Sequence, residues 1–268
     1  MDIKKEIAKN KNIISTTTGN ITSYVLKDPT GLSSTIVKNG VDKLLTIFVN
    51  DVGNRMLSEL EKQKVADVFK YAVDDISKKL RQGKKIRNDG FFSTGTDDKA
   101  DGKEIFESII IEAQREYENK KLQYYGKLFS NISFESNISK PIGIQLISLA
   151  SKLTYRQYML LAIIYKQSLI NNNILFLINK ELVSQEMNFE KISVYQDIYE
   201  LYRNGLINGG GKIIMETGYI NPSELRIQGI GVRLYELMEL ANICLENSND
   251  YIELLNIIKH PNCHIQTE

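Results

Sequence analysis

Residue types that often carry chemistry are scarce in this sequence: its 268 residues include two cysteines and two histidines. Cys244 and Cys263 cannot form a disulfide framework, and such low cysteine usage is typical of a reducing compartment. His260 and His264 lie close to the C-terminus, so a histidine-based catalytic triad is not expected in the folded body. These four side chains can bind metal, but their spacing matches no closed zinc module. We therefore predict no metal site.

The sequence also lacks an excess of charge of either sign. It has 34 basic and 33 acidic residues, for a formal net charge of +1. No global field would draw such a protein onto nucleic acid or an anionic membrane, so any contact of this kind must be local.

Long apolar runs are missing as well. The longest, MLLAII at residues 159–164, is far shorter than the roughly 20 residues that a membrane helix needs. Residues 1–20 contain no continuous apolar segment of the kind found in a signal peptide. The sequence thus predicts a soluble cytoplasmic protein without contact to a membrane.

Apolar residues are present in helical spacing over the first half of the chain. After a polar arm at residues 1–35, they recur every three or four positions from Val41 to Met56 and again from Val65 to Leu80. A second helical stretch is predicted from about Lys103 to Ile132, after a long loop near residues 83–103. Its expected buried stripe consists of Ile110, Ala113, Tyr117, Tyr124 and Leu128, with Glu116 and Lys120 paired on the exposed face.

The second half of the chain, residues 141–245, has the order of a winged helix. Helical segments are followed by two short β-prone runs with turn residues between them, and then by a last helix. Thr154 is a predicted N-cap, and Gly205 is a predicted C-cap that turns the chain into the wing. Ile198, Leu201 and Leu206 are expected in the core.

The predicted fold is therefore mostly α. A helical domain occupies residues 36–140, a winged helix with a three-helix core and a small β wing occupies residues 141–245, and residues 246–268 form a helix end and tail. Pro141 marks the expected boundary between the two domains.

Four segments of the sequence also resemble a known protein family. EAQREYENKKLQYYGKLFSNISF, LASKLTYRQYMLLAII, DIYELYRNGLI and LRIQGIGVRLYELMELANICLE occur in the order and spacing of the Abi-alpha family of abortive-infection proteins. The similarity covers roughly residues 104–245. This sequence departs from the family where Arg156 and Gln157 replace the usual Asp. The resemblance implies a role in bacterial anti-phage defence or prophage-encoded interference. It implies no catalytic activity, because none is established for the family.

Several short motifs imitate catalytic or cofactor sites. The calcium-loop pattern that begins at Asp97 fails, because Lys99 and Ser108 stand where ligands are needed. The segment NGGGK lacks the first Gly and the final Ser or Thr of a phosphate loop. Glu118 and Lys120 have a spacing known from nucleases, but they fall on a predicted helix instead of a strand. We predict no catalytic residues and no cofactor.

A local basic run follows the first helical stretch. Six cations lie within ten residues, and they are Lys78, Lys79, Arg81, Lys84, Lys85 and Arg87. The simplest interpretation is a solvated helix end, where positive charge favours the helix dipole. The alternative is a contact with phosphates of nucleic acid. Phe91 and Phe92 could then stack on unpaired bases or, more simply, anchor the loop to the core.

The winged-helix segment carries no such basic run. Nine basic and nine acidic residues lie between Lys152 and Leu240, and the helix expected to face DNA holds Asp197 and Glu200 against Arg203. A DNA-binding regulator would instead need Arg203, Lys212 and Arg226 to converge on one face. Tyrosines suit protein contacts where they are exposed, and the candidates are Tyr195, Tyr199, Tyr202 and Tyr235. If these tyrosines are buried, they are instead part of the edge of the hydrophobic core.

These observations favour a non-enzymatic binding or sensor protein of phage defence. It would use the winged helix to dock a protein partner or a second copy of itself. The alternatives are a winged-helix transcriptional regulator that binds DNA and, after it, an effector nuclease.

Overall fold

The computed structural model describes residues 57–92, 100–169, 188–210, 220, 224–243 and 248–258. The polar arm, the helix predicted before residue 57, Lys212, and the cysteines and histidines near the C-terminus lie outside these residues. The described part is mostly α, with one small two-stranded antiparallel sheet. The chain divides into two compact units, Met1–Lys152 and Leu153–Glu268, which are described separately below as unit 1 and unit 2. No helix of the described part is long and apolar enough to span a bilayer.

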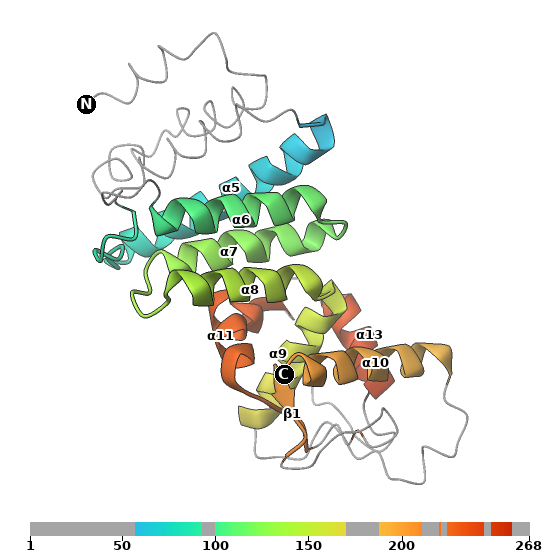
Figure 1. Ribbon diagram of the computed structural model, residues 1–268. Helices are drawn as coiled ribbons and strands as arrows, with labels where there is room; N and C mark the ends of the chain where they lie inside the picture. Colours follow the sequence, from blue (N-terminus) through green and yellow to red (C-terminus); the bar gives the residue numbers. More distant parts are fainter. Residues whose placement is uncertain are drawn as a thin grey trace, which may run out of the picture. The chain divides into compact units, whose positions relative to one another are not determined.

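Unit 1 is built from helices that lie side by side (Figure 1). They are α5 (Glu59–Arg81), α6 (Asp101–Arg115), α7 (Leu122–Ile132) and α8 (Lys140–Lys152). Helix α5 packs mainly on α7, and α8 packs on α6 and α7. The rings of Phe69, Phe106 and Phe129 meet between the first three of these helices, with centroid distances of 6.4 and 4.8 Å.

Local sequence signals explain where α5 begins and ends. Ser58 and Glu61 form a reciprocal capping box at its start. At its end, Gly83 has a φ of 81°, the left-handed conformation that suits glycine. The predicted stripe is confirmed over most of its length, because Val65, Val68, Phe69, Ala72 and Ile76 are buried. Leu80, its last member, is only half-buried.

Helices α5 and α7 approach closely at Gly126. A Cβ atom at this position would lie 2.6 Å from the Cβ of Tyr71 and 2.9 Å from the backbone nitrogen of Ala72. Any larger side chain would therefore push the two helices apart.

The single helix predicted from Lys103 to Ile132 is wrong. Helix α6 ends at Arg115, Glu116 adopts an extended conformation, and a 3-10 turn, η1 (Asn119–Lys121), leads into α7. The expected burial is reversed only at this break, since Glu116 is 8% exposed and Tyr117 is 96% exposed, whereas the other members of the predicted stripe are buried, namely Ile110, Ala113, Tyr124 and Leu128. The helical spacing continues across the break, so periodicity alone could not reveal that the backbone turns there.

The boundary between the two units falls after Lys152, whereas the sequence predicted it at Pro141. Pro141 is the second residue of α8, where its fixed φ and missing N–H are compatible with the first helical turn. Because α8 packs on α6 and α7, it belongs to unit 1.

Unit 2 follows the winged-helix order. Its elements are α9 (Tyr155–Leu169), α10 (Phe189–Arg203), β1 (Ile207–Asn208), β2 (Arg226–Ile227), α11 (Gly229–Leu237), the 3-10 turn η5 (Leu240–Asn242) and α13 (Ser248–Ile258). Strands β1 and β2 pair antiparallel, with Ile207 opposite Ile227. Residues 170–187 between the first two helices and the predicted β run at 212–215 lie outside the described residues.

The predicted caps of unit 2 are confirmed. The hydroxyl of Thr154 accepts a hydrogen bond from the backbone N–H of Gln157, whose side chain accepts one from the N–H of Thr154. Gly205 has a φ of 69°, and the N–H of Leu206 donates to the carbonyl of Leu201 at 3.0 Å. This Schellman motif turns the chain from α10 into β1. The predicted core residues Ile198, Leu201 and Leu206 are buried.

The last predicted helix of the winged unit is interrupted. Helix α11 ends at Leu237, and Glu239 has a φ of 55° before η5 begins. Beyond it, residues predicted as a helix end and tail form α13, which buries Leu254 and Leu255. Apolar residues of the tail are thus part of the core of unit 2.

Candidate functional sites

The basic run of unit 1 divides into two kinds of cation. Lys79 belongs to the buried kind, with only 6% of its side chain exposed. Its ammonium group pairs with Asp75 one turn earlier and lies 3.2 Å from the hydroxyl of Ser130 on α7. Lys79 therefore holds α5 to α7 and is not available to a ligand.

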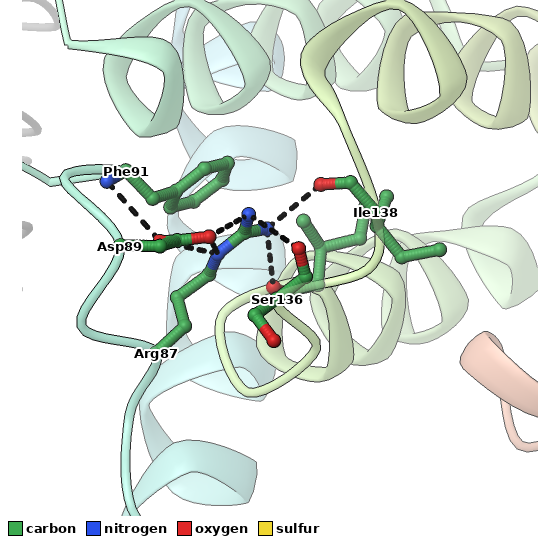
Figure 2. Close-up of polar contacts among 6 residues, drawn as sticks. Arg87, Asp89, Phe91, Ser136 and Ile138 are labelled. Carbon is green, nitrogen blue, oxygen red and sulfur yellow. Dashed lines mark hydrogen bonds and ion pairs between the residues drawn. The ribbon is translucent and has the colours of Figure 1, made fainter.

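Arg87 is also internal, as Figure 2 shows. Its guanidinium group forms a bidentate contact with Asp89, with the closest N–O distance at 2.5 Å. It also donates to the carbonyls of Ile138 at 2.9 Å and Ser136 at 3.2 Å. The side chain is 5% exposed, and the hydrogen bonds from Arg87 hold the pKa of the Asp89 carboxyl below its usual value. Arg87 thus fastens the loop after α5 to the connection between α7 and α8.

The aromatic pair after the basic run points into this unit. The guanidinium carbon of Arg87 lies 4.1 Å from the ring centroid of Phe91, which is 4% exposed. Phe92 meets Phe91 edge to face at 4.8 Å, and both rings lie against Gly102. The anchoring interpretation is confirmed for Phe91, which is too buried to stack on a base.

The remaining cations of the basic run are exposed, and they are Lys78, Arg81, Lys84 and Lys85. We call them the four-cation surface. Of the six cations predicted as candidates for phosphate contact, Lys79 and Arg87 are therefore excluded, because internal hydrogen bonds occupy both side chains.

Unit 1 contains a second buried polar group, which the sequence analysis missed. The carboxylate of Glu116 lies 2.5 Å from the ammonium group of Lys121 and accepts a hydrogen bond of 2.5 Å from the hydroxyl of Tyr125. Lys121 also donates to the carbonyl of Ser151 on α8. Burial alone would raise the pKa of Glu116, but the hydrogen bonds from Lys121 and Tyr125 outweigh it and hold this pKa below its usual value. The cluster is closed to solvent and connects η1, α7 and α8.

In unit 2, the acidic residues of α10 contact α9. Arg156 on α9 pairs with Asp197 at 2.5 Å, and the side-chain amide of Gln157 donates to Asp197 and Glu200 at 3.1 and 3.0 Å. Burial raises the pKa of the Asp197 carboxyl, because lost hydration outweighs the contacts with Arg156. The two residues that depart from the Abi-alpha pattern therefore join the helices of this unit, and the carboxylate of Asp197 is not a free docking group.

The four candidate tyrosines do not form one exposed surface. Tyr195 and Tyr235 are 3% and 6% exposed, and the ring of Tyr235 stacks on Tyr165 at 3.9 Å. Both belong to the core, so their predicted role in partner binding is wrong. Tyr199 and Tyr202 are half-buried and stack on each other at 6.4 Å.

The cations predicted for a DNA-binding face fall on different elements of unit 2. Arg203 ends α10 and Arg226 lies on β2, and both residues are exposed. Lys212 lies outside the described residues, so the predicted convergence of the three stays untested.

A groove between α10 and α13 is the other open feature of unit 2. Polar side chains line it from both helices, among them Glu190, Lys191, Glu253 and Asn256. Phe189 is 87% exposed, Ile192 38% and Ile252 49%, and all three lie on these helices. They are the exposed large hydrophobic residues of the described part of unit 2. This surface was not expected from the sequence, because the residues that form α13 were predicted to be a helix end and tail.

Among the described residues, no group of three or more His, Cys, Asp or Glu side chains could hold a metal ion. Comparison with known proteins does not identify a family for this chain. No family model matches the chain, and no curated protein and no solved structure matches it significantly.

Proposed function

We propose that this chain is a binding protein without chemistry of its own, which acts in bacterial phage defence by docking through the groove between α10 and α13. The observation that carries the docking part is that Phe189 and Ile192 on α10 and Ile252 on α13 are exposed, and that Ile252 lines the groove between these helices. Exposed apolar residues on neighbouring helices mark interaction surfaces more often than scattered ones do. The defence role rests only on the resemblance of residues 104–245 to the Abi-alpha family.

The occupant that this groove fits best is a second copy of the same chain. Its lining carries both signs of charge, with Glu190 and Lys191 from α10 and Glu253 from α13. In a two-fold contact, Lys191 of each copy can meet a carboxylate of the other, while the apolar residues bury one another. A phosphate backbone fits poorly because both glutamates would repel it.

Sedimentation velocity of the purified chain tests this docking. We expect a concentration-dependent dimer that is lost in the double variant Phe189→Ser/Ile252→Ser. The matched control is Tyr117→Ser in unit 1, which removes an aromatic side chain that is 96% exposed and should leave the dimer intact. A chain that stays monomeric at every concentration would contradict self-association. The groove would then be a binding site for another protein or for another segment of the same chain.

The defence role needs a separate measurement. Bacteria that express the chain are challenged with a panel of phages, and plaque numbers are compared with those of cells that carry an empty vector. We expect fewer plaques for at least one phage, with protection lost in Phe189→Ser/Ile252→Ser and retained in Tyr117→Ser. Equal plaque numbers for every phage would contradict the defence role. Protection that survives loss of the dimer would separate defence from docking.

A further inference from the structure

The positive charges of the four-cation surface are not paired with carboxylates of the described residues. Lys78, Arg81, Lys84 and Lys85 are exposed, and none of their side chains makes an ion pair or hydrogen bond with another described residue. Residues 74–89 carry six cations and three carboxylates, a local net charge of +3 in a chain whose total is +1. Two of these carboxylates, Asp75 and Asp89, are paired with Lys79 and Arg87. The positive charge is therefore concentrated on the exposed side chains.

The backbone below these cations is held in place. The N–H of Gly83 donates to the carbonyl of Leu80 at 3.0 Å, and the N–H of Lys84 donates to that of Lys79 at 3.0 Å, as in a Schellman motif. The N–H of Arg87 then donates to the carbonyl of Ser133 at 3.0 Å. Helix end and loop are thus fixed together, which lowers the entropy lost when a ligand binds.

We propose that the four-cation surface binds the phosphate backbone of nucleic acid without recognising its bases. Lysine and arginine that neutralise phosphates supply affinity in a sequence-independent way. Phe91, which follows the run, is 4% exposed, and Phe92 is half-buried and meets it edge to face, so neither of these two rings is fully exposed for stacking. The same inward packing removes the apolar anchor with which peripheral proteins enter a membrane surface. This site lies in unit 1 and does not depend on the docking proposed for unit 2.

The test is fluorescence anisotropy of labelled DNA titrated with the full chain at several salt concentrations. Each phosphate contact contributes about −0.9 to the slope of log K against log salt for duplex and about −0.7 for single strands. Four contacts predict slopes of about −3.6 and −2.8, so between 50 and 200 mM salt the affinity should fall about 150-fold for duplex and about 50-fold for single strands. The two substrates show which form the surface prefers.

The variant Lys84→Gln/Lys85→Gln should halve the slope, because two contacts remain. Affinity for duplex would then fall only about 12-fold over the same range of salt. Both side chains are exposed and neither makes an ion pair or hydrogen bond with a described residue, so the variant should keep the stability of the unaltered chain.

The matched control is Arg115→Gln/Lys152→Gln, which removes two exposed cations of unit 1 and changes the net charge equally. Lys64 near the start of α5 donates to the carbonyl of Glu116, and Lys121 donates to that of Ser151. Both control positions therefore lie beside the N-terminal part of α5, where Lys64 is about 21 Å from Lys78 and about 26 Å from Arg81 along the helix. The control should leave the slope unchanged.

Three results would overturn the proposal. One is absence of DNA binding at 50 mM salt, and another is an equal loss of slope in the control variant, which would mean that net charge and not this surface is responsible. The third is binding to phosphatidylserine vesicles with no binding to either DNA, which would assign the surface to anionic lipid.

Discussion

The two units bury charge in different ways. In unit 1, Lys79, Arg87 and Lys121 have side chains that are 3–6% exposed, and each joins segments that are distant in the sequence. In unit 2, the corresponding contact between α9 and α10 is made by Arg156, whose side chain is 38% exposed. In unit 1 the cations of these three ion pairs are thus buried, although Asp89, the partner of Arg87, is 35% exposed, whereas the cation Arg156 in the described part of unit 2 stays in contact with water.

This difference determines how sensitive each unit is to the loss of one partner. A buried charge that loses its partner bears the full cost of its lost hydration, whereas a partly exposed charge recovers hydration from the solvent. The turns of unit 1, where Arg87 and Lys121 lie, should therefore tolerate single substitutions less well than the α9–α10 contact of unit 2.

The largest expected effect is that of Lys121→Met, which leaves Glu116 buried without its cation. We expect a loss of about 3–5 kcal/mol in the free energy of unfolding, measured by urea denaturation. The double variant Glu116→Leu/Lys121→Met should recover most of this loss, because no charge remains buried. Arg156→Met in unit 2 should cost only about 1 kcal/mol, since solvent screens that pair. Equal losses in the two single variants would refute the comparison.

Close backbone contacts come next. A Cβ at Gly231 would lie 2.2 Å from the carbonyl oxygen of Leu206, so Gly231→Ala should destabilise unit 2 by about 3 kcal/mol. Gly205→Ala is the control, because nothing lies within 4 Å of its Cβ and only its positive φ is unfavourable. We expect about 1 kcal/mol there. Thermal unfolding followed by circular dichroism would rank the two, and the reverse order would contradict the close approach of Leu206 to α11.

The pH dependence of stability should have opposite signs at the two buried carboxyls. The folded pKa of Glu116 lies below its usual value of 4.5, so its contribution is present above pH 4.5 and is lost as the pH falls through the folded pKa. The folded pKa of Asp197 lies above 3.8, so its contribution is present below pH 3.8 and is lost as the pH rises through the folded pKa.

Urea denaturation between pH 3 and pH 7 of the unaltered chain, Glu116→Gln and Asp197→Asn would separate these effects. The stability advantage of the unaltered chain should grow with pH relative to Glu116→Gln and shrink with pH relative to Asp197→Asn. If the stability difference changed with pH in the same direction for both variants, the direction of the pKa shift would be wrong for either Glu116 or Asp197.

The smallest expected effect compares two buried tyrosines. The hydroxyl of Tyr125 donates to Glu116, so Tyr125→Phe should cost about 2 kcal/mol. The buried hydroxyl of Tyr195 makes no hydrogen bond to a described residue, and burial raises its pKa because the charged form would lose hydration. Tyr195→Phe should therefore change stability by less than about 0.5 kcal/mol or increase it slightly. A clear loss at Tyr195 would reveal a hydrogen-bond partner.

Much of the local structure could be predicted from the sequence. The buried stripe of α5, the N-cap at Thr154 and the C-cap at Gly205 are confirmed, because each depends on residues within a few positions of one another. The order of helices and wing followed from the same short-range signals. The break after Arg115 could not be predicted, since Tyr117 has the correct spacing for a helix and only the packing of Glu116 against Lys121 shows that the chain turns.

The functional surfaces divide in the same way. The sequence by itself determined that any contact with phosphate must be local, since the total charge is balanced and the cations gather at one helix end. Only the tertiary structure decided which of these cations are available, because burial and hydrogen bonds to distant carbonyls occupy Lys79 and Arg87. It also decided that Asp197 faces α9, that Phe189 on α10 is exposed and that Ile252 lines the groove between α10 and α13. The physical reason is that composition and spacing govern local conformation, whereas the availability of a side chain depends on what the fold brings against it.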